Sequence, residues 1–218
     1  MSAQEIFTPL QQSFLHQLGR SPLSEAFFLT GGTALSAFFL THRYSEDLDF
    51  FTEEPGQIPQ VLPVLENIAQ TLSGRVEVRR QFKTFLEIFF HSPSGEIIKC
   101  DFAQDSPYRL QPKILQADFG ILTDNALDIS CNKLSALFDR AEAKDFVDVF
   151  FIDRELFPFG ELLQHAKQKH VGLDGYWLAV SLLKVEDLVS LPRMLKPVIL
   201  DDLQTFFLSQ AKLLMSQA

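Results

Sequence analysis

The sequence contains little cysteine, little tryptophan and no long apolar run. Its 218 residues include two cysteines, Cys100 and Cys131, too few for a disulfide framework or a zinc site of cysteines alone. The longest apolar run, 34–40, is interrupted by Ser36 and is far too short to span a bilayer. The first residues show no basic segment followed by an apolar stretch, so no signal peptide is expected. These absences predict a reduced, cytoplasmic protein with no membrane association.

Positive charge is also scarce. Lys and Arg total 19 and Asp and Glu total 28, which gives a net charge of −9 at pH 7. This excludes a uniformly basic nucleic-acid-binding protein, although an acidic chain can still hold phosphates through bound divalent cations. Hydrophobic residues make up 46% of the chain, so a sizeable core is available. The 22 phenylalanines against 3 tyrosines and 1 tryptophan indicate a core rich in phenylalanine.

The order of the expected elements indicates an α+β fold. Short or alternating apolar runs predict strands at 26–30, 48–51, 76–80, 85–90 and 96–102. Periodic apolar patterns predict helices at 4–18, 33–40, 59–72, 130–142, 145–154, 160–170, 174–184 and 197–216. Strands dominate the first part and helices the second. We therefore expect two parts. Residues 1–128 would form a core that includes an N-terminal helix, and residues 129–218 would form a helical subdomain.

Two carboxylates at a spacing of two residues form the first chemical pattern. If 47–51 is extended, Asp47 and Asp49 point to one face while Leu48 and Phe50 turn to the core. Adjacent carboxylates repel each other unless a cation lies between them, and their hard oxygen atoms suit Mg²⁺ or Mn²⁺. The alternative is a pair of solvated acids at a strand edge.

A second alternating pattern places Lys99 and Asp101 on one strand face, with Cys100 and Phe102 toward the core. Asp101 on a neighbouring strand would complete a cluster of three carboxylates of the kind used for phosphoryl displacement with two metal ions.

A glycine turn, Gly31-Gly32-Thr33, follows one expected strand and begins a helix. Glycines allow the backbone to approach a ligand closely, and a helix N-terminus offers free N–H groups to a phosphate. The Thr33 hydroxyl either contacts a phosphate or caps the helix.

Four segments together resemble a known family. Gly31–Leu35 (GGTAL) and His42–Phe51 (HRYSEDLDFF) resemble the first motif of the AbiEii/AbiGii toxin family of nucleotidyltransferases, in the DNA polymerase β-like superfamily. Ile98–Phe102 resembles its second motif, Lys133–Arg140 its third, and Lys144–Asp148 its fourth. The resemblance covers roughly residues 25–155. It implies a polymerase β-like core with a mixed sheet, followed by a helical C-terminal subdomain.

The resemblance implies a metal-dependent enzyme that moves a nucleoside monophosphate from an NTP to a hydroxyl group, with loss of pyrophosphate. Asp47, Asp49 and Asp101 would hold Mg²⁺ or Mn²⁺, and Asp101 would help to deprotonate the acceptor. The residues expected to act in catalysis are Asp47, Asp49, Asp101 and Lys133. Those expected to bind substrate are Gly31, Gly32, Thr33, Arg43, Lys99, Arg140 and Asp145.

Two basic residues outside the carboxylate patterns are expected to bind substrate phosphates. Lys133 and Arg140 are two helical turns apart, so we expect both on one face, where they would neutralise a triphosphate. The alternative is a solvated helix face. Asp145 and Asp148 are each expected to cap the helix or to pair with Lys133 or Arg140. Asp145 is the candidate for an orienting residue, and Asp148 is the weaker one.

We assign separate roles to the two residues that begin the segment 42–51, His42 and Arg43. Arg43 is expected to position the aspartate loop or a phosphate. His42 is expected to lie at the surface or in a turn rather than to act as a base.

The resemblance also implies partners. It suggests a toxin-like role, with tRNA as acceptor in some relatives and a neighbouring antitoxin as partner. One alternative is a nucleotidyltransferase of small molecules such as aminoglycosides, which the negative charge weakly favours. Another is a nucleotide-binding module without turnover, against which the three carboxylates argue. The basic stretch Arg75, Arg79, Arg80 and Lys83 is either an RNA contact or a solvated strand edge.

Overall fold

The structure, a computed structural model, describes residues 6–216 of the chain. These residues form two compact units. The first comprises residues 6–38, 45–108 and 112–125, and the second comprises residues 39–44, 109–111 and 126–216. The division falls after Asn125 rather than after residue 128, and two short segments from the first half of the chain belong to the second unit. Such exchanged segments depend on tertiary contacts, so sequence patterns do not reveal them.

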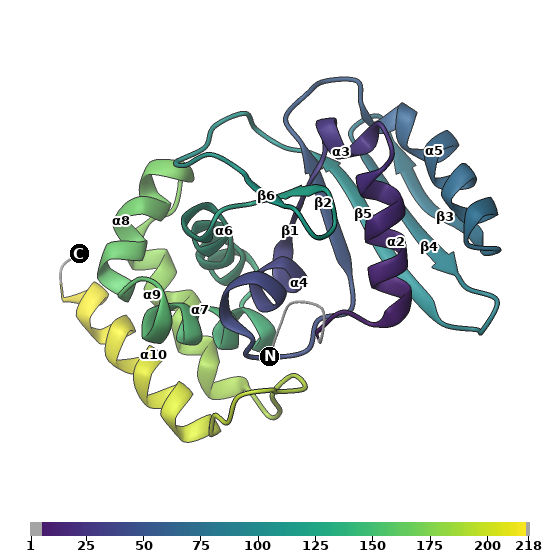
Figure 1. The fold of residues 1–218 in the computed structure, drawn as a ribbon. Coiled ribbons are helices and arrows are strands. Elements are labelled where there is room, and N and C mark those ends of the chain that lie inside the picture. Colours follow the sequence, from purple (N-terminus) through teal and green to yellow (C-terminus); the bar gives the residue numbers. More distant parts are fainter. Residues whose placement is uncertain (1–5, 217–218) are drawn as a thin grey trace. The chain divides into compact units, whose positions relative to one another are not determined.

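The first unit is built on a seven-stranded mixed sheet (Figure 1). Its strands are β1 (Phe28–Thr30), β2 (Leu48–Thr52), β3 (Arg75–Phe82), β4 (Phe85–His91), β5 (Ile97–Gln104), β6 (Ile114–Gln116) and β7 (Ile121–Thr123). They lie in the order β3-β4-β5-β2-β1-β7-β6, and the parallel pairs are β2–β5 and β1–β7. The mixed sheet confirms the expected α+β class.

One face of the central strands of this sheet is buried. On β4, the alternating residues Leu86, Ile88 and Phe90 have no exposed surface. Phe14 of helix α2 (Pro9–Gly19) meets Phe90 edge-on, with ring centroids 5.3 Å apart. Helix α5 (Ile58–Thr71) contacts β3, β4 and β5. Figure 1 shows both helices lying along the sheet, so the α-helical layer of this unit covers the apolar face.

The opposite face of the central strands is largely half-exposed, and we call it the open face. Its side chains come from the alternate positions of the same strands, because successive side chains of a strand point to opposite sides. The open face carries Asp49 and Phe51 from β2, Lys99, Asp101 and Ala103 from β5, and Phe85, Glu87 and Phe89 from β4.

Short helices lead into and out of β1. Helix α3 (Leu23–Ala26) precedes it, and helix α4 (Gly31–Leu35) follows it directly. The chain then continues as a π-helical turn over Ser36–Leu40. The sequence predicts one α-helix over 33–40, so the observed helix starts earlier and widens. Single π-helical turns are often found at functional sites.

The second unit is helical. Its helices are α6 (Ala126–Asp139), α7 (Ala143–Glu155), α8 (Phe159–Lys169), α9 (Gly175–Leu183) and α10 (Leu200–Met215), with a 3₁₀ turn at Lys184–Asp187. Phe146 of α7 and Phe207 of α10 pack edge to face at 4.9 Å within the core. The helices expected after residue 129 are therefore present, although α6 begins at Ala126. Within residues 6–216, no helix has the length and apolar character needed to cross a membrane.

The sequence analysis does not predict two of the strands and one of the helices. β6 and β7 have three residues each, and α3 has four. Elements this short display no alternation or helical period in the sequence. Only their contacts in the folded structure reveal them.

The burial of β4 leads to a test of the core. Phe90 has no exposed surface, so Phe90→Ala should leave a cavity beside Phe14 and lower the free energy of unfolding by about 3–5 kcal/mol. Phe82 of the same hairpin is 64% exposed, and Phe82→Ala should cost less than about 0.5 kcal/mol. Urea unfolding followed by circular dichroism measures both. Equal losses would contradict the assignment of Phe90 to the core.

Candidate active site

Two aspartates from neighbouring strands lie side by side on the open face. β2 and β5 run parallel, and their register makes Asp49 and Asp101 direct partners. Residues paired in this way point to the same side of a sheet, and the two strands lie about 4.8 Å apart. The structure therefore brings together one carboxylate from each of two motifs that are 52 residues apart (101 − 49).

The same row of the sheet carries polar residues on three further strands. Asp49 pairs with Thr30 of β1, and Asp101 pairs with Glu87 of β4. Glu87 in turn pairs with Arg80 of β3, whose Nε donates to Glu87 Oε2 at 2.9 Å. The two aspartates thus belong to a continuous row of polar residues that runs across the sheet.

Asp47 lies just before β2 rather than within it, so the expected strand placement of this residue is wrong. Its side chain is 51% exposed and approaches the pair through Lys99. Lys99 Nζ lies 2.8 Å from Asp101 Oδ2 and 3.5 Å from Asp47 Oδ2. Burial lowers the pKa of Lys99, but the hydrogen bond to Asp101 and the charges of Asp47 and Asp49 more than offset it, and the pKa is raised. Lys99 is a charged link between two of the three carboxylates.

The turn after β1 fits closely against Asp49. Helix α4 begins with Gly31, Gly32 and Thr33. Gly31 has a φ angle of +74°, and a Cβ atom there would lie 2.0 Å from Asp49 Oδ2. Only glycine combines this backbone conformation with room for the carboxylate. The position of Asp49 therefore depends on the absence of a side chain at Gly31.

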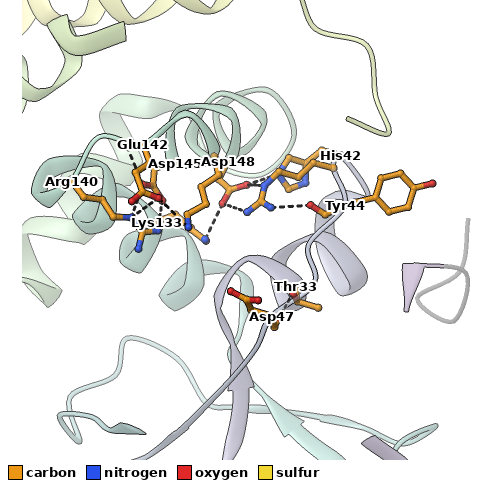
Figure 2. Close-up of polar contacts among 11 residues, drawn as sticks. Thr33, His42, Tyr44, Asp47, Lys133, Arg140, Glu142, Asp145 and Asp148 are labelled. Carbon is orange, nitrogen blue, oxygen red and sulfur yellow. Dashed lines mark hydrogen bonds and ion pairs between the residues drawn. The ribbon is translucent and has the colours of Figure 1, made fainter. Parts of the chain in front are cut away.

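Thr33 has a role that differs from both expected ones. Its side chain is fully buried, and its hydroxyl donates to the main-chain carbonyl of Asp47 at 2.5 Å. The N-cap position of α4 belongs to Thr30. Thr33 therefore holds the loop that carries Asp47, and Figure 2 shows the two residues together.

The donor atoms of the open face suit a hard divalent cation. Asp101 Oδ1 is buried and accepts no hydrogen bond from the residues that the structure describes. A buried carboxylate oxygen without a partner is costly, and a cation such as Mg²⁺ would provide one. As they stand, no three His, Cys, Asp or Glu side chains within residues 6–216 are grouped to hold a metal ion. Gathering Asp47, Asp49 and Asp101 around one requires Lys99 to move from between Asp47 and Asp101.

In the second unit, three basic side chains converge on one buried carboxylate, that of Asp148 on α7 (Figure 2). Arg43 binds it through two groups, with Nε 2.6 Å from Oδ1 and Nη2 2.8 Å from Oδ2. His42 Nε2 lies 2.7 Å from Oδ1, and Lys133 Nζ lies 2.9 Å from Oδ2. All four side chains are buried. We call these residues the Asp148 cluster.

The charges of the Asp148 cluster stabilise the ionised carboxylate. Burial alone raises the pKa of Asp148, but Lys133, Arg43 and His42 outweigh burial and hold the pKa well below its usual range. Burial also lowers the pKa of His42, despite the adjacent carboxylate. His42 is therefore neutral at pH 7 and donates from Nε2, and the cluster holds two cations against one anion.

This cluster shows partners that the sequence analysis does not rank first. His42 is expected at the surface or in a turn, and its side chain is instead fully buried. His42, Arg43 and Lys133 all bind Asp148, which the sequence analysis ranks below Asp145. Complementary charge draws them together once the helix is buried, because an unpaired ion in that position would be strongly destabilising.

Arg140 and Asp145 form a separate pair at the start of α7. Arg140 Nε and Nη2 donate to the two oxygens of Asp145, both at 2.7 Å. Asp145 is fully buried and also accepts the main-chain N–H of Glu142, the N-cap residue of α7. Arg140 follows the last residue of α6, and its side chain is 44% exposed. Asp145 thus orients an accessible guanidinium group, whereas Lys133 is buried.

Sequence reasoning missed Glu87 and undervalued Asp148. The alternation over residues 85–89 was a usable signal for Glu87, since it places that carboxylate on the face opposite Leu86 and Ile88. Asp148 had only its spacing of three from Asp145, which gives no hint of a buried arginine partner from residue 43.

Comparison with known families matches residues 13–207 to the family described as nucleotidyl transferase AbiEii toxin, Type IV TA system. The matched region contains all of the expected site residues, and the match confirms the resemblance seen in the motifs. An uncharacterized protein of Aquifex aeolicus (strain VF5) is 29% identical over 180 residues, which cover 81% of this chain and 82% of that protein.

Two solved structures share the fold. JHP933 from Helicobacter pylori has a TM-score of 0.62 at 18% identity and covers 99% of this chain and 92% of its own. MenT4, the nucleotidyltransferase toxin Rv2826c from Mycobacterium tuberculosis H37Rv, has a TM-score of 0.62 at 15% identity, covering 94% and 82%. At these identities the likeness concerns the fold, and it confirms the expected nucleotidyltransferase architecture.

The Asp148 cluster predicts a large effect from a small substitution. Asp148→Asn removes the charge that Arg43 and Lys133 share, so the free energy of unfolding should fall by about 3–5 kcal/mol. Asp139→Asn, on the exposed end of α6, is the matched control and should change it by less than about 0.5 kcal/mol. Urea unfolding of both variants checks this. A loss below about 1 kcal/mol for Asp148→Asn would show that the cluster is not a buried ion network.

Proposed function

The chain belongs to the AbiEii family of nucleotidyl transferase toxins, and on this basis we propose that it moves a nucleoside monophosphate from an NTP to a hydroxyl acceptor, releasing pyrophosphate. The observation that carries the proposal is the pairing of Asp49 with Asp101 beside Gly31. This arrangement holds two carboxylates together at a turn that leaves room for only a glycine. It concentrates negative charge in one row of the sheet, which a bound divalent cation would offset.

The proposal includes Mg²⁺ or Mn²⁺, held by Asp49 and Asp101 with Asp47 as a third ligand. The buried Asp101 Oδ1 without a hydrogen-bond partner supports this assignment among the described residues. When bound, such an ion stabilises the charge that develops on phosphoryl oxygens. The protein's own contribution is positioning. Thr33 holds the Asp47 loop, and Asp101 would accept the proton of the attacking hydroxyl group.

Arg140 is the residue that we propose for the triphosphate in the second unit. Asp145 orients its guanidinium group, and the side chain remains partly exposed. Arginine presents a fork of N–H donors that matches phosphate oxygens. Lys133 and Arg43 are instead assigned to holding Asp148, and so to the stability of the unit.

The biological part of the proposal is a toxin paired with a cognate antitoxin, acting in the cytoplasm on tRNA or another hydroxyl acceptor. The family description, which names a Type IV toxin–antitoxin system, supports the pairing. The second candidate acceptor is a cationic small molecule such as an aminoglycoside. The net charge of −9 favours that acceptor, because a negative protein attracts cations.

One assay distinguishes these acceptors. The protein is incubated with Mg²⁺ and each labelled NTP in turn, together with total tRNA or with an aminoglycoside. Label on tRNA supports the proposal, and label on the aminoglycoside alone supports the second candidate. Saturable NTP binding without transfer to either would contradict the assignment as a transferase of these substrates.

Asp49→Asn should reduce transfer by roughly a hundredfold or more, because a metal ligand contributes several kcal/mol of charge stabilisation. The substitution keeps the side-chain shape, so the urea midpoint of the variant should stay close to that of the parent. The rate of label incorporation at saturating Mg²⁺ measures the effect. Unchanged turnover would show that the catalytic site lies elsewhere in the chain.

A pair of glycine substitutions tests the turn against Asp49. Gly31 and Gly56 both have positive φ angles, +74° and +83°, so alanine strains the backbone at either position by about 1–2 kcal/mol. Only Gly31→Ala also drives a Cβ atom into Asp49, since nothing lies within 4 Å of a Cβ atom at Gly56. Gly31→Ala should therefore abolish transfer while Gly56→Ala retains it. Similar activities in the two variants would refute the proposed role of the turn.

A further inference from the structure

The outer part of the open face combines aromatic rings with arginines. Phe82, at the end of β3, pairs with Phe85 of β4, and Phe89 lies on the same face of β4. Arg79 Cζ lies 5.4 Å from the ring centroid of Phe89, and Arg80 Cζ lies 5.5 Å from that of Phe85. Phe82 is 64% exposed. We call these five residues the aromatic edge.

The aromatic edge is locally basic in an acidic protein. The charged side chains on β3, its turn and the facing part of β4 are Arg75, Arg79, Arg80, Lys83, Glu77 and Glu87. Four are positive and two negative, a local sum of +2 in a chain whose net charge is −9. Arg79 pairs with Glu77 and Arg80 with Glu87, so what an approaching anion meets here is the net positive charge of the whole group.

The aromatic edge continues directly into the carboxylate row. Arg80 pairs with Glu87, and Glu87 pairs with Asp101. Two strand spacings separate Arg80 from Asp101, a distance of about 10 Å across the sheet. Figure 1 shows β3, β4 and β5 side by side at this end of the sheet. A chain lying along the open face could thus contact both the aromatic edge and Asp101.

Several features disfavour strand addition at this edge of the sheet. β3 is the outermost strand, but its register with β4 shifts between Val78 and Arg80, and its residues include three arginines. Bulges and charged side chains are the features that protect edge strands from pairing with another chain. The rings face out of the sheet plane, where they offer flat surfaces rather than hydrogen bonds.

We propose that the aromatic edge binds a single-stranded segment of an RNA acceptor, with an unpaired base stacked on Phe82 and phosphates near Arg79 and Arg80. The inference rests on the proposed function, since it supplies the acceptor for transfer at Asp101. Every base has a flat face that stacks on an aromatic ring, whereas bases in a duplex are already stacked on each other. A small cationic acceptor would be repelled by the same arginines.

Fluorescence anisotropy tests this inference with a labelled short single-stranded RNA and a blunt RNA duplex of the same sequence. The full-length protein should bind the single strand more tightly. Phe82→Ala should weaken that binding about tenfold, the usual effect of losing one stacking platform. Arg79→Gln should reduce the slope of log affinity against log salt by roughly 0.7, as expected for one phosphate contact. Trp177→Ala, on an aromatic residue 60% exposed in α9, should leave affinity unchanged.

The outcomes separate this inference from the proposed function, because binding is measured without an NTP. Equal affinity for duplex and single strand, or unchanged affinity in Phe82→Ala, overturns the inference even if transfer occurs. An equal loss in Trp177→Ala also overturns it, since stacking would not then be specific to the aromatic edge. Selective RNA binding by a protein that transfers no nucleotide supports the inference and contradicts the proposed function alone.

Discussion

The parallel register of β2 and β5 is the constraint on which the candidate active site depends. Side chains alternate along a strand, so a slip of one residue would turn Asp49 or Asp101 into the core and expose Phe50 or Phe102. The burial of those phenylalanines, whose rings stack at 5.0 Å, therefore holds the two carboxylates together on the open face. The turn at Gly31 then limits where Asp49 can lie. Apolar packing on one face of the sheet thus creates charge density on the other.

In the second unit a buried anion organises the basic residues. Asp148 binds Arg43 and Lys133, and it accepts from a neutral His42. The same segment is held by its backbone, since Tyr44 N–H donates to the carbonyl of Arg193 at 2.9 Å. His42 and Arg43 come only a few residues before Asp47 in the sequence, and the Asp148 cluster holds the segment that contains them. Arg140, held separately by Asp145, keeps an accessible guanidinium group.

Much of this arrangement can be predicted from the sequence. The rest cannot, and the reasons are physical. Alternation identified β2, β4 and β5 and placed Asp49, Lys99 and Asp101 on one face, because period two is unambiguous in strands with one buried side. β6 and β7 are too short to show a period. Helical spacing put Lys133 and Arg140 on one face, but spacing does not say which carboxylate each will find. Burial of Asp148 decides that Lys133 turns inward.

The central claim is that Asp49 and Asp101 jointly hold a divalent ion beside the Gly31 turn. Anomalous diffraction from crystals soaked with Mn²⁺ and a non-hydrolysable NTP tests it most directly, because it locates the ion without relying on activity. We expect anomalous density in contact with both carboxylates, with Lys99 Nζ displaced from between Asp47 and Asp101. Mn²⁺ bound away from this pair, or no bound ion while Lys99 keeps its present contacts, would contradict the claim.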